Sequence, residues 1–139
     1  MTTPSREQVM SLLRQSLEEA GIVPRTHPKE CGWEIHVNFR KMKNEICGVE
    51  VDLGYTRAEF YFDLVGLATT CEKTGDPDAW LREHVRHEVV HVLLAPLANF
   101  AEYLCEDDQA MKKLFTDAME AATKNVTILW CRLAEREKS

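Results

Sequence analysis

Residues 76–97, DPDAWLREHVRHEVVHVLLAPL, decide how the rest of the chain is interpreted. Asp76 and Pro77 are typical of a helix start, as the N-cap and the first helical residue. Pro96 disfavours helical geometry at the residue before it, so we expect the helix to run from Pro77 to about Leu94. Its apolar positions recur at helical spacing and predict one buried stripe: Leu81, Val85, Val89 and Val92.

The second half of this helix contains His87-Glu88-Val89-Val90-His91, which has the form H-E-x-x-H. Two histidines four residues apart project from one helix face, where a single zinc ion can bind both imidazoles. Glu88 lies roughly 100° further around the helix, so it can reach a metal-bound water without ligating the metal. Only 5 of the 139 residues are histidine, and the position of the string in a capped amphipathic helix makes an accidental match improbable.

Three segments upstream of the motif helix alternate apolar and polar residues with the period of a strand. They are Gly32–Arg40, Glu45–Leu53 and Ala58–Leu64. The short link 41–44 favours a hairpin between the first two segments, so we expect an antiparallel meander of three strands. Residues 69–75 are polar and predict a loop before the motif helix.

Helices are also expected on both sides of these elements. Thr3 is a plausible N-cap for a first helix over Pro4–Ala20. A short helix is expected over Leu97–Cys105, and a long last helix follows the acidic residues 106–108 and ends near Arg136. The apolar stripe of the last helix consists of Met111, Phe115, Ala118, Ala122, Val126, Leu129 and Leu133.

These elements predict a single α+β domain over residues 1–139. In it, a small three-stranded antiparallel sheet packs against the N-terminal helix, the motif helix and the long C-terminal helix. The formal net charge of -6 and the lack of a strong basic cluster argue against a nucleic-acid partner. The longest apolar stretch, residues 89–100, is interrupted by polar residues and proline, which argues against a membrane span. The polar N-terminus and five scattered cysteines predict a cytoplasmic protein with reduced thiols.

The chain resembles the zincins, in particular compact gluzincin-type metallopeptidases and small zincin-like proteins encoded by phages and prophages. The resemblance is specific across residues 87–97 and includes Asp76-Pro77 and the strand 58–64. It implies a zinc-dependent peptidase fold with Zn²⁺ as cofactor, in the cytoplasm of a bacterial or phage-infected cell. It also implies that strand 58–64 is an edge strand that holds an extended substrate peptide by β-augmentation.

Carried over to this sequence, the resemblance makes His87 and His91 zinc ligands and Glu88 the general base. The resemblance also implies a third zinc ligand, usually a glutamate on a later helix. Glu120 is the leading candidate, since it lies on the last helix about where compact gluzincins place theirs, and Glu102 is the alternative. Glu106, Asp117 or no protein ligand at all remain open.

The helical wheel places Glu120 on the side of the last helix opposite its apolar stripe, in a strip with Thr116, Thr123 and Thr127. Such a polar strip can face a site or water. His84 and Tyr103 are weaker candidates, for substrate orientation and for oxyanion binding, and each is more readily explained as a residue without a role in the site.

Two functional hypotheses follow. The first is a zinc metallopeptidase in which a metal-activated water attacks a peptide bond and Glu88 accepts its proton; a narrow form of it would cut one regulatory partner. The second is a non-catalytic protein of the same fold that binds metal for stability or captures a partner peptide. The sequence names no substrate and no oligomeric state.

Overall fold

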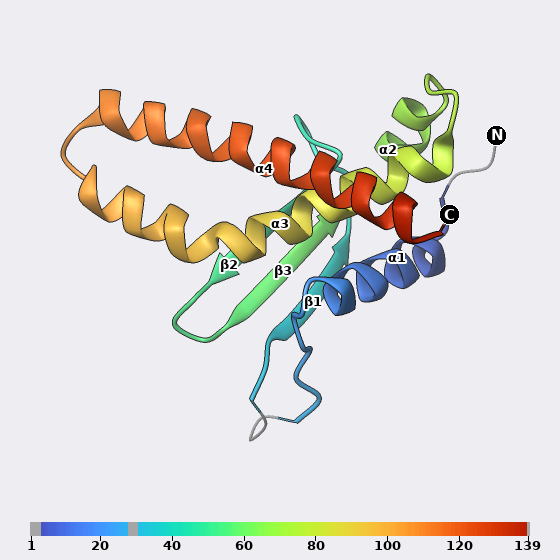
Figure 1. The fold of residues 1–139 in the computed structure, drawn as a ribbon, viewed down its shortest axis with the longest axis horizontal. Coiled ribbons are helices and arrows are strands. Elements are labelled where there is room, and N and C mark those ends of the chain that lie inside the picture. The colour runs from blue at the N-terminus through green and yellow to red at the C-terminus, as the bar shows by residue number, and fades with distance from the viewer. Residues whose placement is uncertain (1–3, 28–30, 139) are drawn as a thin grey trace.

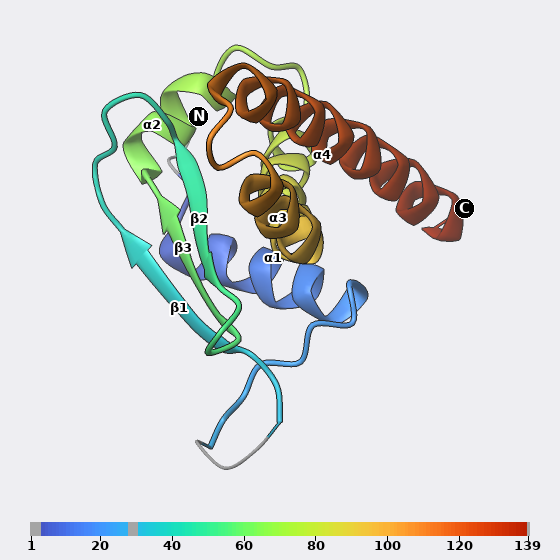
Figure 2. The same cartoon turned by 90° about the vertical axis from the view of Figure 1, so that its left-hand side faces the viewer.

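The computed structural model describes residues 4–27 and 31–138. A three-stranded sheet forms one layer, and α1, α3 and α4 lie on one side of it (Figures 1 and 2). The elements follow the chain in the order α1 (Arg6–Glu19), β1 (Glu34–Phe39), β2 (Cys47–Asp52), β3 (Arg57–Phe62), α2 (Leu64–Cys71), α3 (Pro77–Leu104) and α4 (Gln109–Lys138). The α+β class predicted from the sequence is therefore confirmed.

The sheet is mixed, so the prediction of an antiparallel sheet is wrong. Its strand order is β1-β3-β2, with β1 parallel to β3 and β2 antiparallel to β3. Residues 40–46 do not form the expected hairpin; they cross the end of β3 to the opposite edge of the sheet. Hydrogen bonds to that end hold the crossing: the Arg40 N–H donates to the Phe62 carbonyl (3.0 Å), and the Asp63 N–H donates to the Ile46 carbonyl (2.9 Å).

Asp63 stabilises this crossing with its side chain. One carboxylate oxygen accepts from the Met42 N–H (3.1 Å), and the other caps α2 by accepting from the Gly66 N–H (3.0 Å). These backbone hydrogen bonds, that of Gly66 first, hold the pKa of Asp63 below its usual value. The cap explains why α2 begins at Leu64, where the sequence analysis expected the strand to continue and then a loop.

β3 is the central strand, and the prediction that segment 58–64 is a peptide-binding edge strand is therefore wrong. Both sides of β3 are hydrogen-bonded to neighbouring strands along its length. A central position suits its composition, because Ala58, Phe60 and Phe62 are fully buried. The open edges of the sheet belong to β1 and β2.

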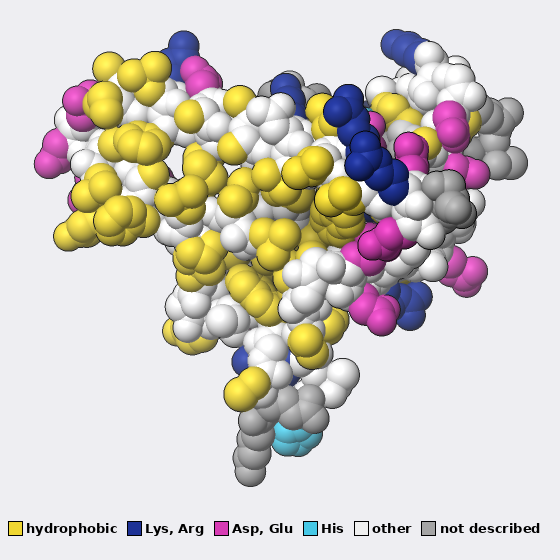
Figure 3. Space-filling view, in the orientation of Figure 1, with side chains coloured by type: hydrophobic (Ala, Val, Ile, Leu, Met, Phe, Trp, Pro, Cys, Tyr) yellow, Lys and Arg dark blue, Asp and Glu magenta, His cyan; other side chains and the backbone are white. Residues whose placement is uncertain are grey.

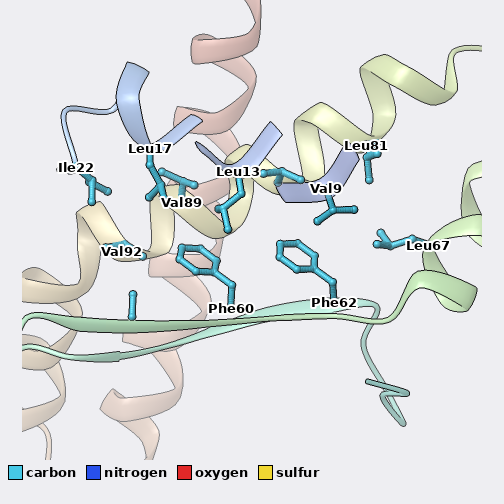
Figure 4. Close-up of a cluster of buried hydrophobic side chains, with 12 residues drawn as sticks. Val9, Leu13, Leu17, Ile22, Phe60, Phe62, Leu67, Leu81, Val89 and Val92 are labelled. Atoms are coloured by element: carbon cyan, nitrogen blue, oxygen red, sulfur yellow. The ribbon is translucent and has the colours of Figure 1, made fainter. Parts of the chain in front are cut away.

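The core lies between β3 and the helices. Phe60 and Phe62 point from β3 toward Val9 and Leu13 of α1 and toward Val89 of α3 (Figure 4). The apolar stripe predicted for the motif helix is buried: Leu81, Val85, Val89 and Val92 are each at most 5 % exposed. Packing of this stripe fixes the rotation of α3 and therefore the direction in which the motif residues point.

Two helix boundaries differ from the predictions. Ser5 caps α1 in a capping box with Gln8, so the helix begins at Arg6; the predicted N-cap, Thr3, lies outside the described residues. α3 does not break at Pro96 but continues to Leu104, and so includes the predicted short helix. Proline removes one helical hydrogen bond. Beyond it the helix packs on α4, and Ala101 and Cys105 are buried, which supports this part of α3.

α4 returns along α3 as the second arm of a helical hairpin (Figure 1). Its C-terminal part is attached to the body by the Trp130 indole, which donates to Glu19 Oε2 of α1 (2.9 Å). The Arg86 guanidinium of α3 lies 3.4 Å from the same oxygen. In the part of the chain that the structure describes, no helix is long and apolar enough to cross a membrane.

Candidate metal centre

Three side chains converge at the point where α4 crosses the middle of α3. His87 and His91 lie one turn apart on α3, and their Nε2 atoms are 3.2 Å from each other. Glu120 reaches them from α4, with Oε1 3.0 Å from His87 Nε2 and Oε2 3.5 Å from His91 Nε2. Potential ligand atoms of all three residues lie within 4.8 Å of one another.

His87, His91 and Glu120 could together hold one metal ion. Zinc bonds of about 2.0–2.2 Å to nitrogen and oxygen place neighbouring ligand atoms roughly 3.3 Å apart. The pairwise distances above are near this value, and the two to Glu120 involve different oxygens of its carboxylate. Burial, followed by the neighbouring His87, lowers the pKa of His91. A lowered pKa favours the neutral imidazole, which is the form that binds a metal.

Glu88 lies beside the triad and is buried, with 6 % of its surface exposed. Its Oε1 accepts a hydrogen bond from the Cys47 thiol of β2 (3.5 Å). Burial raises the pKa of Glu88 to about 7, with a smaller contribution in the same direction from the negative charges of Glu45 and Glu120, while the hydrogen bond from Cys47 opposes the shift. A carboxylate with such a pKa can accept a proton near neutral pH.

These residues line a cleft of about 850 Å³ between β2 and the two long helices. The triad and Glu88 form part of its wall, and the inward side chains of β2 form the opposite part: Cys47, Val49 and Val51. His84 also lines the cleft. Its Nδ1 lies 2.9 Å from the Trp80 carbonyl oxygen and its ring stacks on the Trp80 indole, so one of its nitrogens is engaged locally.

The structure separates Glu120 from the other candidate ligands. Glu102, the alternative, forms an ion pair with Lys112 (3.3 Å) and is not part of the triad. Within the described residues, Glu106 and Asp117 are also outside the cluster and do not line the cleft. Tyr103 is 74 % exposed and lies outside the cleft, so the structure does not support an oxyanion role for it.

The sequence analysis did not identify Cys47, Glu45 or Lys124 as residues of the site. All three line the cleft, and the first two alter the pKa of Glu88. Alternation along segment 45–53 places Cys47 on the same side as Val49 and Val51, and all three line the cleft. Nothing in that pattern indicated which helix the side would face, because the contact joins residues 41 positions apart.

No family model matches the sequence, and neither a curated protein nor a solved structure is significantly similar to it. The functional argument therefore depends on the geometry of the cleft.

Proposed function

We propose that this protein is a zinc-dependent hydrolase of the metallopeptidase type. His87, His91 and Glu120 would hold the zinc ion, and Glu88 would serve as the general base. The observation that supports this proposal is the convergence of two imidazoles and a carboxylate, with potential ligand atoms within 4.8 Å of one another, beside a second, buried carboxylate in one open cleft.

Zinc bound at such a site lowers the pKa of a water ligand to about 7 and polarises a substrate carbonyl. The chain itself supplies proton transfer. With a pKa of about 7, Glu88 can accept a proton from water and return it to a leaving amine. The Cys47 thiol holds one oxygen of that carboxylate in place.

The open edge of β2 is the place where we expect a peptide substrate to bind. The Asp63 N–H donates to the Ile46 carbonyl, so Ile46 and Asp63 form a hydrogen-bonded pair that continues the antiparallel β2–β3 ladder. Because bonded and non-bonded pairs alternate in an antiparallel ladder, the backbone groups of residues 47, 49 and 51 face away from β3. An extended peptide could pair with these groups along the cleft.

The decisive variant is Glu88→Gln, assayed as zinc-loaded protein with a mass-spectrometric library of extended peptides. We expect the wild type to bind zinc and cleave, and the variant to keep zinc and lose at least ~100-fold in cleavage rate. Glu83→Gln is the matched control, because Glu83 is an exposed carboxylate on the same helix and in the same cleft. Cleavage by Glu88→Gln at the wild-type rate would remove Glu88 from the mechanism, and absence of zinc from the wild type would refute the whole proposal.

The burial of Glu88 favours a second candidate, a non-catalytic protein that binds zinc and captures a peptide. A carboxyl group with a pKa of about 7 is partly protonated at neutral pH, and only 6 % of this residue is exposed to the cleft. Tight zinc binding and a large thermal shift on chelation, without cleavage of any library peptide, would select this candidate.

A further inference from the structure

The long helix α4 turns its polar strip toward the body of the protein and its apolar stripe toward solvent. Within the described residues, the only buried side chains of α4 are Thr123 and Thr127, which bond back to carbonyls one turn earlier. The large members of the stripe are 36–57 % exposed: Met111, Phe115, Val126, Leu129 and Leu133. An amphipathic helix normally gains its stability by burying such a stripe.

This exposed apolar surface is concentrated on one part of the molecule. Of the 15 large apolar side chains exposed among the described residues, 12 lie on the last part of α3 or on α4. The space-filling view shows hydrophobic side chains gathered along both helices of the hairpin (Figure 3). Single exposed apolar residues need no explanation, but a continuous patch of this kind marks an interaction site.

The spacing of the α4 stripe is regular. Its members are separated by 4, 3, 4, 4, 3 and 4 residues, from Met111 to Leu133. This is two 11-residue repeats, whose period of about 3.67 residues per turn is close to that of a straight helix. The stripe therefore stays on one face for its whole length of roughly 33 Å.

The same spacing is palindromic about Ala122. Two copies of α4 placed antiparallel, with a two-fold axis at Ala122, would bring every stripe residue onto a stripe residue of the other copy. Phe115 would meet Leu129 of the second copy, and Met111 would meet its Leu133. The small side chains of Ala118 and Ala122 would let the two helices approach closely at the centre.

We propose that the α4 stripe is the interface of a two-fold symmetric homodimer, in which α4 packs antiparallel on α4 of a second copy. A two-fold interface must be self-complementary, and a palindromic stripe satisfies that requirement in one register.

The exposed apolar area of the stripe is compatible with a second copy of the chain as its partner. The five large side chains of the stripe and the neighbouring Leu114 are 36–63 % exposed along roughly 33 Å of helix. A stable interface buries about 800 Å² per partner including its polar rim, so the apolar stripe and the charged flanks of α4 would together form the contact. Glu120 lies on the opposite side of α4, so the dimer leaves the metal centre open and does not depend on the proposed function.

The test is the mass of the full chain in solution, measured by light scattering and sedimentation equilibrium from roughly 1 to 100 µM. We expect twice the 16.0 kDa chain mass. Leu129→Glu and Phe115→Lys should each weaken dimerisation by at least ~100-fold, because each places an unpaired charge inside the apolar contact, about two turns from its centre at Ala122. Leu129 is 57 % and Phe115 36 % exposed in the single chain, so neither change removes a side chain from the core. Leu129→Glu is the primary variant, because Phe115 also lines a hollow between α3 and α4. Val65→Glu is the control, since Val65 is 73 % exposed on α2, away from the stripe.

The double variant tests the direction and register of the pairing. In the antiparallel dimer, the lysine introduced at position 115 of one copy meets the glutamate introduced at position 129 of the other. Phe115→Lys combined with Leu129→Glu should therefore regain at least ~10-fold of the lost affinity. A parallel pair would place like charges opposite each other and regain nothing.

Three results would overturn the proposal. They are a monomer throughout the concentration range, a dimer that both single variants leave intact, and a double variant no tighter than either single variant. Circular dichroism of each variant shows whether α4 is folded, and the two independent single variants keep the test valid if one of them misfolds.

Discussion

Replacing Glu88 by glutamine should stabilise the metal-free protein at high pH, although we expect it to abolish catalysis. Burial raises the pKa of Glu88 from 4.5 to about 7 in the folded state. A carboxyl group with a raised pKa binds its proton more tightly when folded. Its contribution to stability is therefore fully present below about pH 4.5 and is lost as the pH rises through 7.

The size of the effect follows from the shift in pKa. The difference between 4.5 and about 7 corresponds to about 3 kcal/mol. A glutamine side chain at this position would have a similar shape, would still accept a hydrogen bond from Cys47, and would not titrate. The metal-free variant should therefore match the wild type near pH 4.5 and exceed its free energy of unfolding by up to about 3 kcal/mol at pH 8.

The assay is urea unfolding with a chelator present, followed by circular dichroism at several pH values between 4.5 and 8. Protein concentration must be held constant, because a dimer makes apparent stability depend on it. Other groups titrate in this range, but they are common to both proteins, so the difference between the two isolates Glu88. Glu83→Gln, which removes an exposed carboxylate from the same helix, should change stability by less than ~0.5 kcal/mol at every pH.

Equal pH dependence in wild type and Glu88→Gln would refute this reasoning, because it would mean that the carboxyl group is not desolvated in the folded protein. A variant less stable than the wild type at pH 8 would have the same meaning. In either case the base of the proposed mechanism would lose its tuned pKa.

Two further predictions concern the site. Glu120→Ala should weaken zinc binding at least ~100-fold by calorimetry, whereas Glu102→Ala should not change it, since only the first carboxylate lies on the histidines; equal affinities for both variants would leave the third ligand unassigned. Cys47→Ala removes the hydrogen bond that lowers the pKa of Glu88, so the acid limb of kcat/KM should move to higher pH. An unmoved profile would show that the thiol does not act on the base.

The motif helix could be predicted from the sequence because its determinants are local. Asp76 caps it by accepting from the Ala79 N–H (3.2 Å), as Asp-Pro at this position predicts. The apolar period identified the buried stripe, and H-E-x-x-H identified two members of the triad. Only the end of the helix was wrong, because packing against α4, and not the local sequence around Pro96, supports the helix beyond that residue.

The order of the strands could not be predicted in the same way. Alternation along a strand shows which residues share a face, but it does not show which strands are neighbours. A short link favoured a hairpin between β1 and β2, whereas Asp63 holds residues 40–46 across the end of β3. That one side chain both caps α2 and places β2 at the edge that borders the cleft, and neither role is visible in local periodicity.

The sequence of α4 left two possible environments for Glu120. The helical wheel placed it on a polar strip that could face water or a site, and the choice is made by contacts distant in sequence. Trp130 and Arg86 both meet Glu19 of α1, and this junction holds α4 with its threonine strip against α3. No pattern within α4 itself contains that information.

The inward polar strip of α4 links the proposed metal centre to the proposed dimer. A helix that packed in the usual way would bury Leu129 and Phe115 and would turn Glu120 away from the histidines. Because α4 turns its polar strip inward, the Glu120 carboxylate reaches His87 and His91, and the side chains of described α4 residues that are fully buried are those of Thr123 and Thr127. Burial of the outward stripe by a second copy would add apolar burial to α4. If both proposals hold, variants that separate the copies should also loosen α4 and weaken zinc binding, even though the substituted residues lie on the far side of the helix from the metal.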